Sequence, residues 1–171
     1  KAVYAEDWQW QDGMYLPWLG NDIRVRCLPI LGRSAPEPFM QHGELHLPVA
    51  ANTPDKIKTT LMRWCQTQAR NHFSQRLQHF EQMMGVRHTQ LRIMYPKACW
   101  GTSRINGHIA LHWGLMHFSP EVVDYVVVHE LAHLHQMNHS PWFWAHVAAV
   151  LPDYQARQKE LKAGVLPPWK G

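Results

Sequence analysis

Four histidines and one carboxylate lie within the segment HELAHLHQMNHSPWFW, residues 129–144. On a helix, His129 and His133 would lie about 40° apart on one side, one turn above the other. Their imidazoles can therefore bind the same metal ion. Glu130 would lie about 100° around the helix from His129, where it can reach a water molecule on the ion but is poorly placed to be a ligand. The spacing predicts a metal site with Glu130 as a general base.

The third ligand is expected to be His139. A continuous helix would place His139 about 15 Å along the axis from His129, whereas the ligands of one zinc ion each lie about 2 Å from it. The chain must therefore turn back. Asn138 can adopt the left-handed conformation that ends helices, and Ser140-Pro141 can begin a new helix. We predict that the helix breaks near Met137 or Asn138 and that His139 folds over the site.

Three neutral imidazoles leave the fourth position of Zn²⁺ open for water, which is typical of catalytic zinc rather than structural zinc. The ion lowers the pKa of such a water toward about 7, and Glu130 would take its proton and return it to the leaving group. The site follows the apolar run Val126–Val128. Burial of a carboxylate and histidines there would cost free energy unless they were paired or ligated. Zn²⁺ is the expected cofactor, and another divalent metal remains open.

The other polar residues near this segment receive lesser roles. His135 would lie about 120° from His129 on the helix, so we expect it to be exposed or to donate a hydrogen bond behind the ligands. His146 is expected to pack in the core, and it is the replacement ligand if His139 does not bind. Tyr154 and His112 are the candidates for stabilising an oxyanion.

The elements that position these residues can be read from the same sequence. Thr53-Pro54-Asp55 predicts the start of one long amphipathic helix that ends at Gly85. Residues 14–50 are strand-like and are expected to form a small N-terminal antiparallel sheet. LRIMY, CWGTSRI and HIALHW are expected to form further strands within residues 91–113. Asn106-Gly107 predicts a type I′ hairpin turn between the last two.

Along HIALHW, alternation places apolar side chains on one face and His108 and His112 on the other, facing the cleft. Helices are expected to begin at Ser119, Ser140 and Pro152-Asp153, and the last should end near Gly164. Strands followed by helices favour an α+β fold in a single domain, residues 1–171. Residues 1–13 are expected to be a flexible or truncated N-terminal segment.

Composition narrows the class of protein. Apolar residues make up 46% of the chain and charged residues 18%, so a folded core is expected. The net charge is +4 with histidine neutral, but Lys and Arg are scattered, so nucleic acid is not an expected partner. Three distant cysteines exclude a disulfide framework and favour a cytoplasmic location. No apolar run reaches the length of a membrane span.

Three segments carry a family resemblance: WGTSRINGHIALHW (100–113), SPEVVDYVVVHELAHLHQMNHSPWFW (119–144) and PDYQARQKELK (152–162). They resemble the YgjP-like family of small bacterial metal-dependent hydrolases, which are zincin-type metallopeptidases related to the SprT-like proteins. The resemblance covers residues 14 to about 163. It implies a zincin-like fold.

The resemblance also implies roles for particular residues. The metal ligands would be His129, His133 and His139, and Glu130 would be the catalytic base. An extended peptide would pair with the strand 108–113 beside the cleft. The family usually has WGSC where this chain has Trp-Gly-Thr-Ser at residues 100–103.

Several functions stay open at this point. The first is a zinc metallopeptidase acting on peptides or unfolded proteins. The second is a metal-dependent nucleotide phosphohydrolase, because metal-activated water also attacks phosphorus, and Arg87, Arg92, Lys97 and Arg104 could neutralise phosphates. The third is a non-catalytic, metal-stabilised binding protein, although a structural site needs no base. A fourth, DNA-linked proteolysis, comes only from the SprT-like kinship, and the diffuse charge weighs against it.

Overall fold

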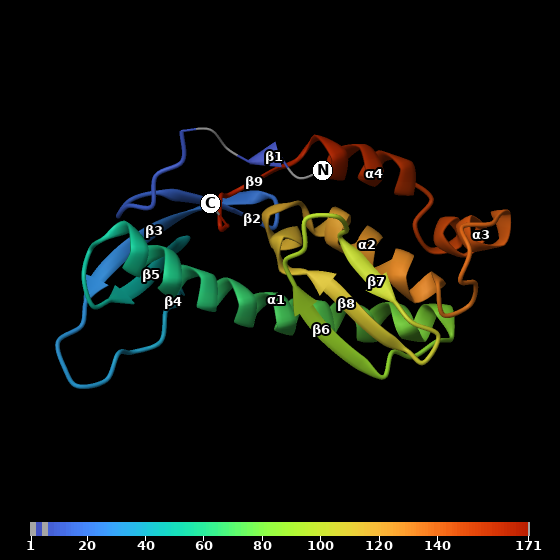
Figure 1. Cartoon of the computed structure of the whole chain (residues 1–171), viewed down its shortest axis with the longest axis horizontal. Coiled ribbons are helices and arrows are strands. Elements are labelled where there is room, and N and C mark those ends of the chain that lie inside the picture. Colours follow the sequence, from blue (N-terminus) through green and yellow to red (C-terminus); the bar gives the residue numbers. More distant parts are fainter. Residues whose placement is uncertain (1–2, 5–6, 171) are drawn as a thin grey trace.

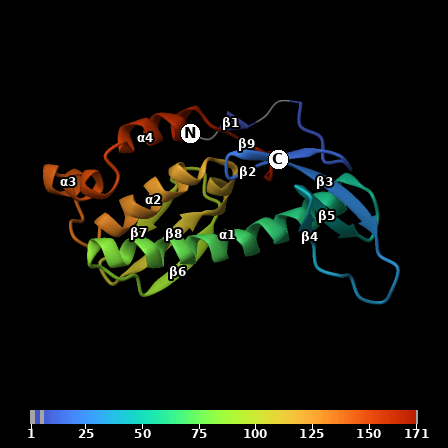
Figure 2. The same ribbon diagram turned by 180° about the vertical axis from the view of Figure 1, so that it is seen from behind.

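The computed structural model describes residues 3–4 and 7–170. In this part of the chain, one long helix spans the molecule, with one sheet at its N-terminal half and another at its C-terminal half (Figures 1 and 2). The helices are α1 (Pro54–Met84), α2 (Pro120–Ala132), α3 (Pro141–Val150) and α4 (Tyr154–Ala163), with a 3-10 turn η1 (Trp113–His117). The strands are β1 (Val3–Tyr4), β2 (Tyr15–Trp18), β3 (Asn21–Pro29), β4 (Phe39–Gln41), β5 (Glu44–Val49), β6 (Gln90–Met94), β7 (Gly101–Ser103), β8 (His108–His112) and β9 (Val165–Leu166). This is the predicted α+β fold.

Helix α1 has the predicted bounds. The Thr53 hydroxyl accepts a hydrogen bond from the N–H of Lys56, and Gly85 ends the helix in the left-handed conformation with φ +68°. The buried side chains recur at helical spacing: Ile57, Leu61, Trp64, Cys65, Ala69, Phe73, Leu77 and Phe80. This stripe packs against α2, so α1 supports the helix that carries the candidate site.

The N-terminal sheet is mixed rather than antiparallel as predicted. Its order is β2-β3-β5-β4, and β3 pairs with β5 in parallel. After β3, the loop 30–38 leads to β4 at the edge of the sheet and leaves room for one strand between β3 and β4. The hairpin at His42 and Gly43 then places β5 in that position, beside β3. Both turn residues have positive φ, 51° and 76°. A histidine in the left-handed region is uncommon, so no strong local signal predicts this turn.

The second sheet has the order β6-β8-β7, so β8 is its central strand. The predicted pairing of a peptide with residues 108–113 is therefore wrong, because β6 and β7 already occupy both edges of β8. The free edge beside α2 belongs to the three-residue strand β7. The hairpin itself is confirmed, but its turn is not type I′. Gly107 donates to the carbonyl of Arg104 at 2.9 Å and alone has positive φ, as in a type I turn followed by a glycine bulge.

Helix α2 ends earlier than predicted. It begins at the Ser119 cap, as expected, but stops at Ala132 rather than near Met137 or Asn138. The N–H of Leu134 bonds to the carbonyl three residues back at 3.0 Å, which tightens the last turn. His135 Nε2 then donates to the carbonyl of Met84, at the end of α1, over 2.6 Å. Residues 133–137 contain no glycine or proline, so the contact of His135 with α1, rather than a local sequence signal, accompanies this early end.

The two chain ends meet in a small sheet. Val3–Tyr4 pairs in parallel with Val165–Leu166, and Trp169 packs against Trp10 with ring centroids 4.6 Å apart. The expectation of flexibility for residues 1–13 falls partly outside the described residues and stays a prediction. Within the described residues, no helix is long and apolar enough to cross a membrane.

Two buried histidines predict how stability depends on pH. Burial is the main cause that lowers the pKa of both His112 and His117 to about 4. His117 accepts a hydrogen bond from the Trp169 indole at 2.9 Å and donates one to the Pro17 carbonyl at 2.8 Å, so the folded state holds it neutral. Between pH 6.5 and 4 the unfolded chain binds more protons than the folded chain. We therefore expect the free energy of unfolding to fall as the pH is lowered through this window, by roughly 3 kcal/mol per histidine.

Urea denaturation between pH 7.5 and 4 would measure this effect. His117→Phe should be less stable at neutral pH and should show a shallower loss on acidification. His42→Asn is the matched control, because His42 is exposed in a turn where asparagine also tolerates positive φ. An equal slope for wild type and His117→Phe would contradict the prediction.

Candidate metal centre

The structure brings together the three histidines proposed as ligands. The ligand atoms of His129, His133 and His139 all lie within 4.8 Å of one another. His129 lies in the last turn of α2, His133 is the C-cap residue of this helix, and His139 returns toward them from the loop before α3. The early end of α2 therefore still gives the convergence that the spacing required.

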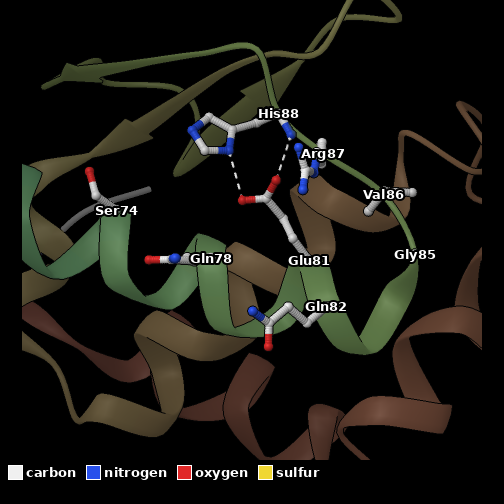
Figure 3. A pocket seen from close by; sticks show the side chains of 8 residues that line it. All are labelled: Ser74, Gln78, Glu81, Gln82, Gly85, Val86, Arg87 and His88. Carbon is white, nitrogen blue, oxygen red and sulfur yellow. Dashed lines mark hydrogen bonds and ion pairs between the residues drawn. The ribbon is translucent and has the colours of Figure 1, made fainter.

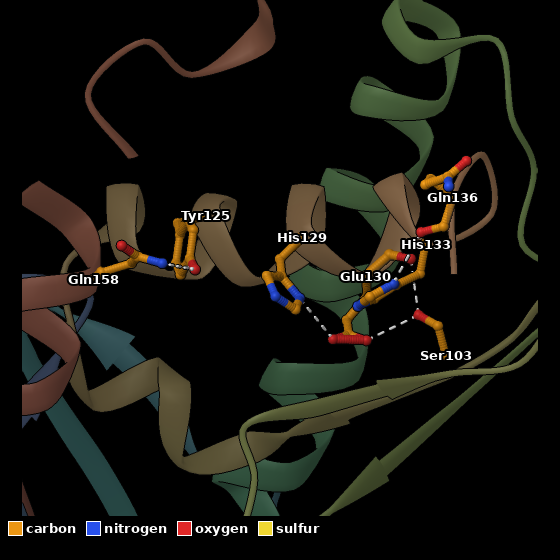
Figure 4. Close-up of polar contacts among 7 residues, drawn as sticks. All are labelled: Ser103, Tyr125, His129, Glu130, His133, Gln136 and Gln158. Atoms are coloured by element: carbon orange, nitrogen blue, oxygen red, sulfur yellow. Dashed lines mark hydrogen bonds and ion pairs between the residues drawn. The ribbon is translucent and has the colours of Figure 1, made fainter. Parts of the chain in front are cut away.

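Hydrogen bonds determine which ring nitrogen of His129 and of His133 is free to bind a metal ion. His129 Nδ1 lies 3.0 Å from Glu130 Oε1, and His133 Nδ1 lies 3.2 Å from the carbonyl oxygen of Gln136 (Figure 4). Both partners are acceptors, so each Nδ1 carries the proton and each Nε2 keeps its lone pair. Burial is the first cause that lowers the pKa of His133, which favours the neutral ring that a metal requires. This donor set fits a divalent ion that prefers nitrogen.

Aromatic side chains of α3 pack against the rings of the cluster. Phe143 is fully buried, and its ring centroid lies 5.0, 4.4 and 4.9 Å from those of His129, His133 and His139. Trp144 stacks on His139 with centroids 6.0 Å apart. The start of α3 therefore fixes the three rings in place, a role that the sequence analysis did not assign to these residues.

Glu130 lies between the cluster and strand β7. Its residue exposure is 3%, and its Oε2 accepts a hydrogen bond from the Ser103 hydroxyl at 2.8 Å (Figure 4). The Ser103 oxygen also lies 2.8 Å from the backbone carbonyl of Glu130. A Cβ atom on Gly101 would lie only 2.9 Å from Glu130 Cγ, so this position needs glycine for β7 to pack so closely. The carboxylate is thus held between His129 and an edge strand.

The other predicted residues lie in different places. His112 is buried between Tyr95 and Trp100, with centroids 4.3 and 4.7 Å away, and its Nδ1 accepts from the N–H of Gly114. It cannot face a cleft or stabilise an oxyanion, because the strand ends there and the chain turns into η1. His108 is exposed on the outer face of the sheet.

His146 is exposed rather than buried in the core as predicted, and its ring stacks on that of His135 with centroids 4.4 Å apart. Neither belongs to the ligand cluster. Tyr154 stacks on Trp144 at 5.2 Å, which places it at the border of the site.

Tyr125 is a neighbour of the site that the sequence analysis missed. It precedes His129 by one helical turn, their ring centroids are 5.9 Å apart, and its hydroxyl accepts a hydrogen bond from the Gln158 amide at 2.9 Å (Figure 4). Burial, ahead of the charge of Glu130, raises the pKa of Tyr125, so its hydroxyl remains a donor at neutral pH. The sequence contains a pattern that could have identified Tyr125: residues 125, 129 and 133 are spaced four apart, so they are neighbours on one helix face.

Comparison with known proteins agrees with this geometry. The model of the YgjP-like metallopeptidase domain matches residues 3–164. The chain belongs to the YgjP-like family. It is therefore a metal-dependent hydrolase of metallopeptidase type, as the resemblance implied.

Two solved structures are similar to this YgjP-like chain. The abylysin zymogen of Pyrococcus abyssi, a metallopeptidase, is 24% identical with a TM-score of 0.50, covering 56% of this chain and 98% of its own. The jannalysin zymogen of Methanocaldococcus jannaschii, also a metallopeptidase, is 17% identical with a TM-score of 0.45, covering 53% of this chain and 91% of its own. At such identity, the abylysin match supports the fold. No curated protein matches the sequence.

One hollow of this YgjP-like chain lies away from the histidine cluster. It measures about 940 Å³ and is lined by the last turns of α1 and the segment 85–88 (Figure 3). Glu81 accepts two hydrogen bonds from His88, one from the backbone N–H at 3.0 Å and one from Nδ1 at 2.9 Å. The pair ties the segment after α1 to the helix, and the hollow holds none of the candidate ligands.

Proposed function

We propose that this chain is a zinc metallopeptidase in which His129, His133 and His139 hold the ion and Glu130 is the general base. The observation that supports this most is the convergence of three imidazoles beside a buried carboxylate and a free strand edge. When bound, the ion would supply Lewis acidity toward the scissile carbonyl and the attacking water.

Glu130 would accept the proton of the attacking water and then deliver it to the leaving amine. Its Oε2 lies beside the Ser103 hydroxyl, which has one proton and two acceptors in reach, the carboxylate and the backbone carbonyl of Glu130. Ser103 can donate to the carboxylate while it is charged and can turn to the carbonyl once Glu130 is protonated. Ser103 is therefore the positioning residue of the base in this proposal.

Ser103→Ala should lower kcat/KM by about 10- to 100-fold, as the loss of a supporting hydrogen bond does at metal sites. Ser103→Thr keeps the hydroxyl and should restore part of the rate. Ser74→Ala, in the exposed part of α1, is the control. An unchanged kcat/KM in Ser103→Ala would remove this role.

The substrate would lie along β7. Strand addition to a free edge aligns an extended peptide through backbone hydrogen bonds, and β7 passes directly over Glu130. A peptide or an unfolded protein segment is the substrate class that such an edge accepts. The Tyr125 hydroxyl and Tyr154 border the site and are the candidates for stabilising the oxyanion.

One assay tests the proposed function. The zinc-loaded protein is incubated with a broad peptide library and with denatured proteins, and the products are identified by mass spectrometry. We expect internal cleavage that stops when a chelator strips the metal and returns with Zn²⁺. If protein with one zinc per chain cleaves nothing, the proposal fails.

A nucleoside triphosphate panel in the same experiment tests the phosphohydrolase alternative. Among the four cations first considered for phosphates, Arg92 and Arg104 line one depression, whereas Arg87 borders the distant hollow at the end of α1. Phosphate release that depends on Glu130, without peptide cleavage, would favour this alternative.

A further inference from the structure

The outer face of the second sheet, which is turned away from α2, holds a depression of about 210 Å³. Its walls come from all three strands: Gln90, Arg92, Thr102, Arg104, His108, Ile109 and Ala110. Arg92, Ala110 and Thr102 are register partners across the sheet. Because the side chain of Ala110 is small, the surface of the sheet is hollow there, between the longer side chains around it. We call this hollow the cationic depression.

The walls of the cationic depression carry hydrogen-bond donors and no carboxylate. Two guanidinium groups, an imidazole, an amide and a hydroxyl surround the floor. Within residues 3–4 and 7–170, neither Arg92 nor Arg104 forms an ion pair. A guanidinium matches a carboxylate in shape and can bind it through two parallel hydrogen bonds. The charge and the shape therefore suit a carboxylate ligand.

Backbone hydrogen bonds show which residues of β7 face its free edge. Toward β8, the N–H of Arg104 bonds to the carbonyl of His108, and the carbonyl of Trp100 accepts from His112, both at 3.0 Å. Antiparallel pairing alternates, so Gly101 and Ser103 direct their N–H and C=O groups away from β8. These are the groups that an added peptide strand would use.

Side-chain alternation then connects the edge to the cationic depression. Residues directly opposite each other in paired antiparallel strands point to the same face of the sheet. Peptide residues opposite Gly101 and Ser103 would face Glu130, because these two β7 residues do. Peptide residues opposite Thr102 and Arg104 would point to the outer face and reach the cationic depression.

We propose that the cationic depression is a specificity subsite for an acidic side chain of the peptide substrate, placed there by strand addition to β7. The proposal rests on the proposed peptidase function and names its substrate class: extended segments with Asp or Glu at an alternate position beside the scissile bond.

The test compares matched peptides that carry Glu, Gln or Lys at each of three positions on either side of one cleaved bond. With the zinc-loaded wild type, kcat/KM should be about tenfold or more higher for Glu than for Gln at one position and lowest for Lys, because the contact joins opposite charges. Arg104→Gln and Arg92→Gln should reduce the Glu preference to about twofold, with the rate on the Gln peptide retained. Arg33→Gln, in the exposed loop after β3, should change nothing.

A binding measurement tests whether the preference for an acidic side chain arises in peptide binding rather than in the catalytic step. In a Glu130→Gln background, fluorescence anisotropy should show tighter binding of the Glu peptide than of the Gln peptide, and Arg104→Gln should remove the difference. Cleavage without any acidic preference would overturn this inference and leave the proposed function standing. No cleavage of any peptide would end both. Oligonucleotide binding that is lost in Arg92→Gln, without a peptide preference, would assign the depression to nucleic acid instead.

Discussion

Glu130→Gln is expected to reduce kcat for peptide cleavage by about 10²- to 10⁴-fold, the range that a general base contributes. Glutamine has the same size, and its amide oxygen can still accept the hydrogen bond from Ser103, which now spans 2.8 Å. It cannot take a proton from water.

The measurement is kcat/KM on a cleaved peptide, combined with metal analysis of the purified variant. Zinc content should equal that of the wild type, because Glu130 is not a proposed ligand. Glu121→Gln is the matched control: it makes the same change in an exposed residue of the same helix. If Glu130→Gln kept more than a tenth of the activity, another group would have to be the base.

The second large effect concerns His139. We expect His139→Ala to weaken zinc affinity by at least about 100-fold, since loss of residues that only support ligands already costs 10- to 100-fold. His139 is exposed and lies in a loop, so the fold should persist without it. The helical pair His129 and His133 would remain, but two imidazoles alone make an incomplete site.

Competition with a zinc-binding dye measures this affinity, and thermal unfolding with and without Zn²⁺ gives a second readout. A ligand at about 100 times its Kd stabilises the folded state by about 2.7 kcal/mol, and most of this gain should be lost in His139→Ala. His146→Ala, which removes the exposed alternative ligand, should retain it. Equal losses in both variants, or no loss in His139→Ala, would overturn the assignment.

Local signals in the sequence predicted much of the scaffold. The caps at Thr53 and Ser119 and the glycine at residue 85 mark helix ends, because each depends on neighbours within four residues. The spacing of His129 and His133 likewise follows from helical geometry alone. These features depend on short-range physics, so the sequence displays them directly.

Features that depend on distant partners could not be predicted in the same way. Helix α2 ends where His135 meets the carbonyl of Met84, 51 residues earlier in the chain. The edge beside the candidate metal centre is β7 because β6 pairs with β8 in parallel, which no turn signal specifies. His112 alternates like a surface residue, but the chain turns into η1 after it and buries it among aromatic rings.

The shortness of β7 has a consequence for how copies of this protein behave together. A long open strand edge invites other molecules to stack and aggregate. Here Gly101 and Ser103 offer only a few backbone groups, and the exposed Arg104 adds a charge beside them. Two copies meeting through this edge would gain few hydrogen bonds and would bring like charges together. In the proposed function, a peptide substrate would also be held by the metal ion, so an edge this short can still bind substrate while it disfavours self-association.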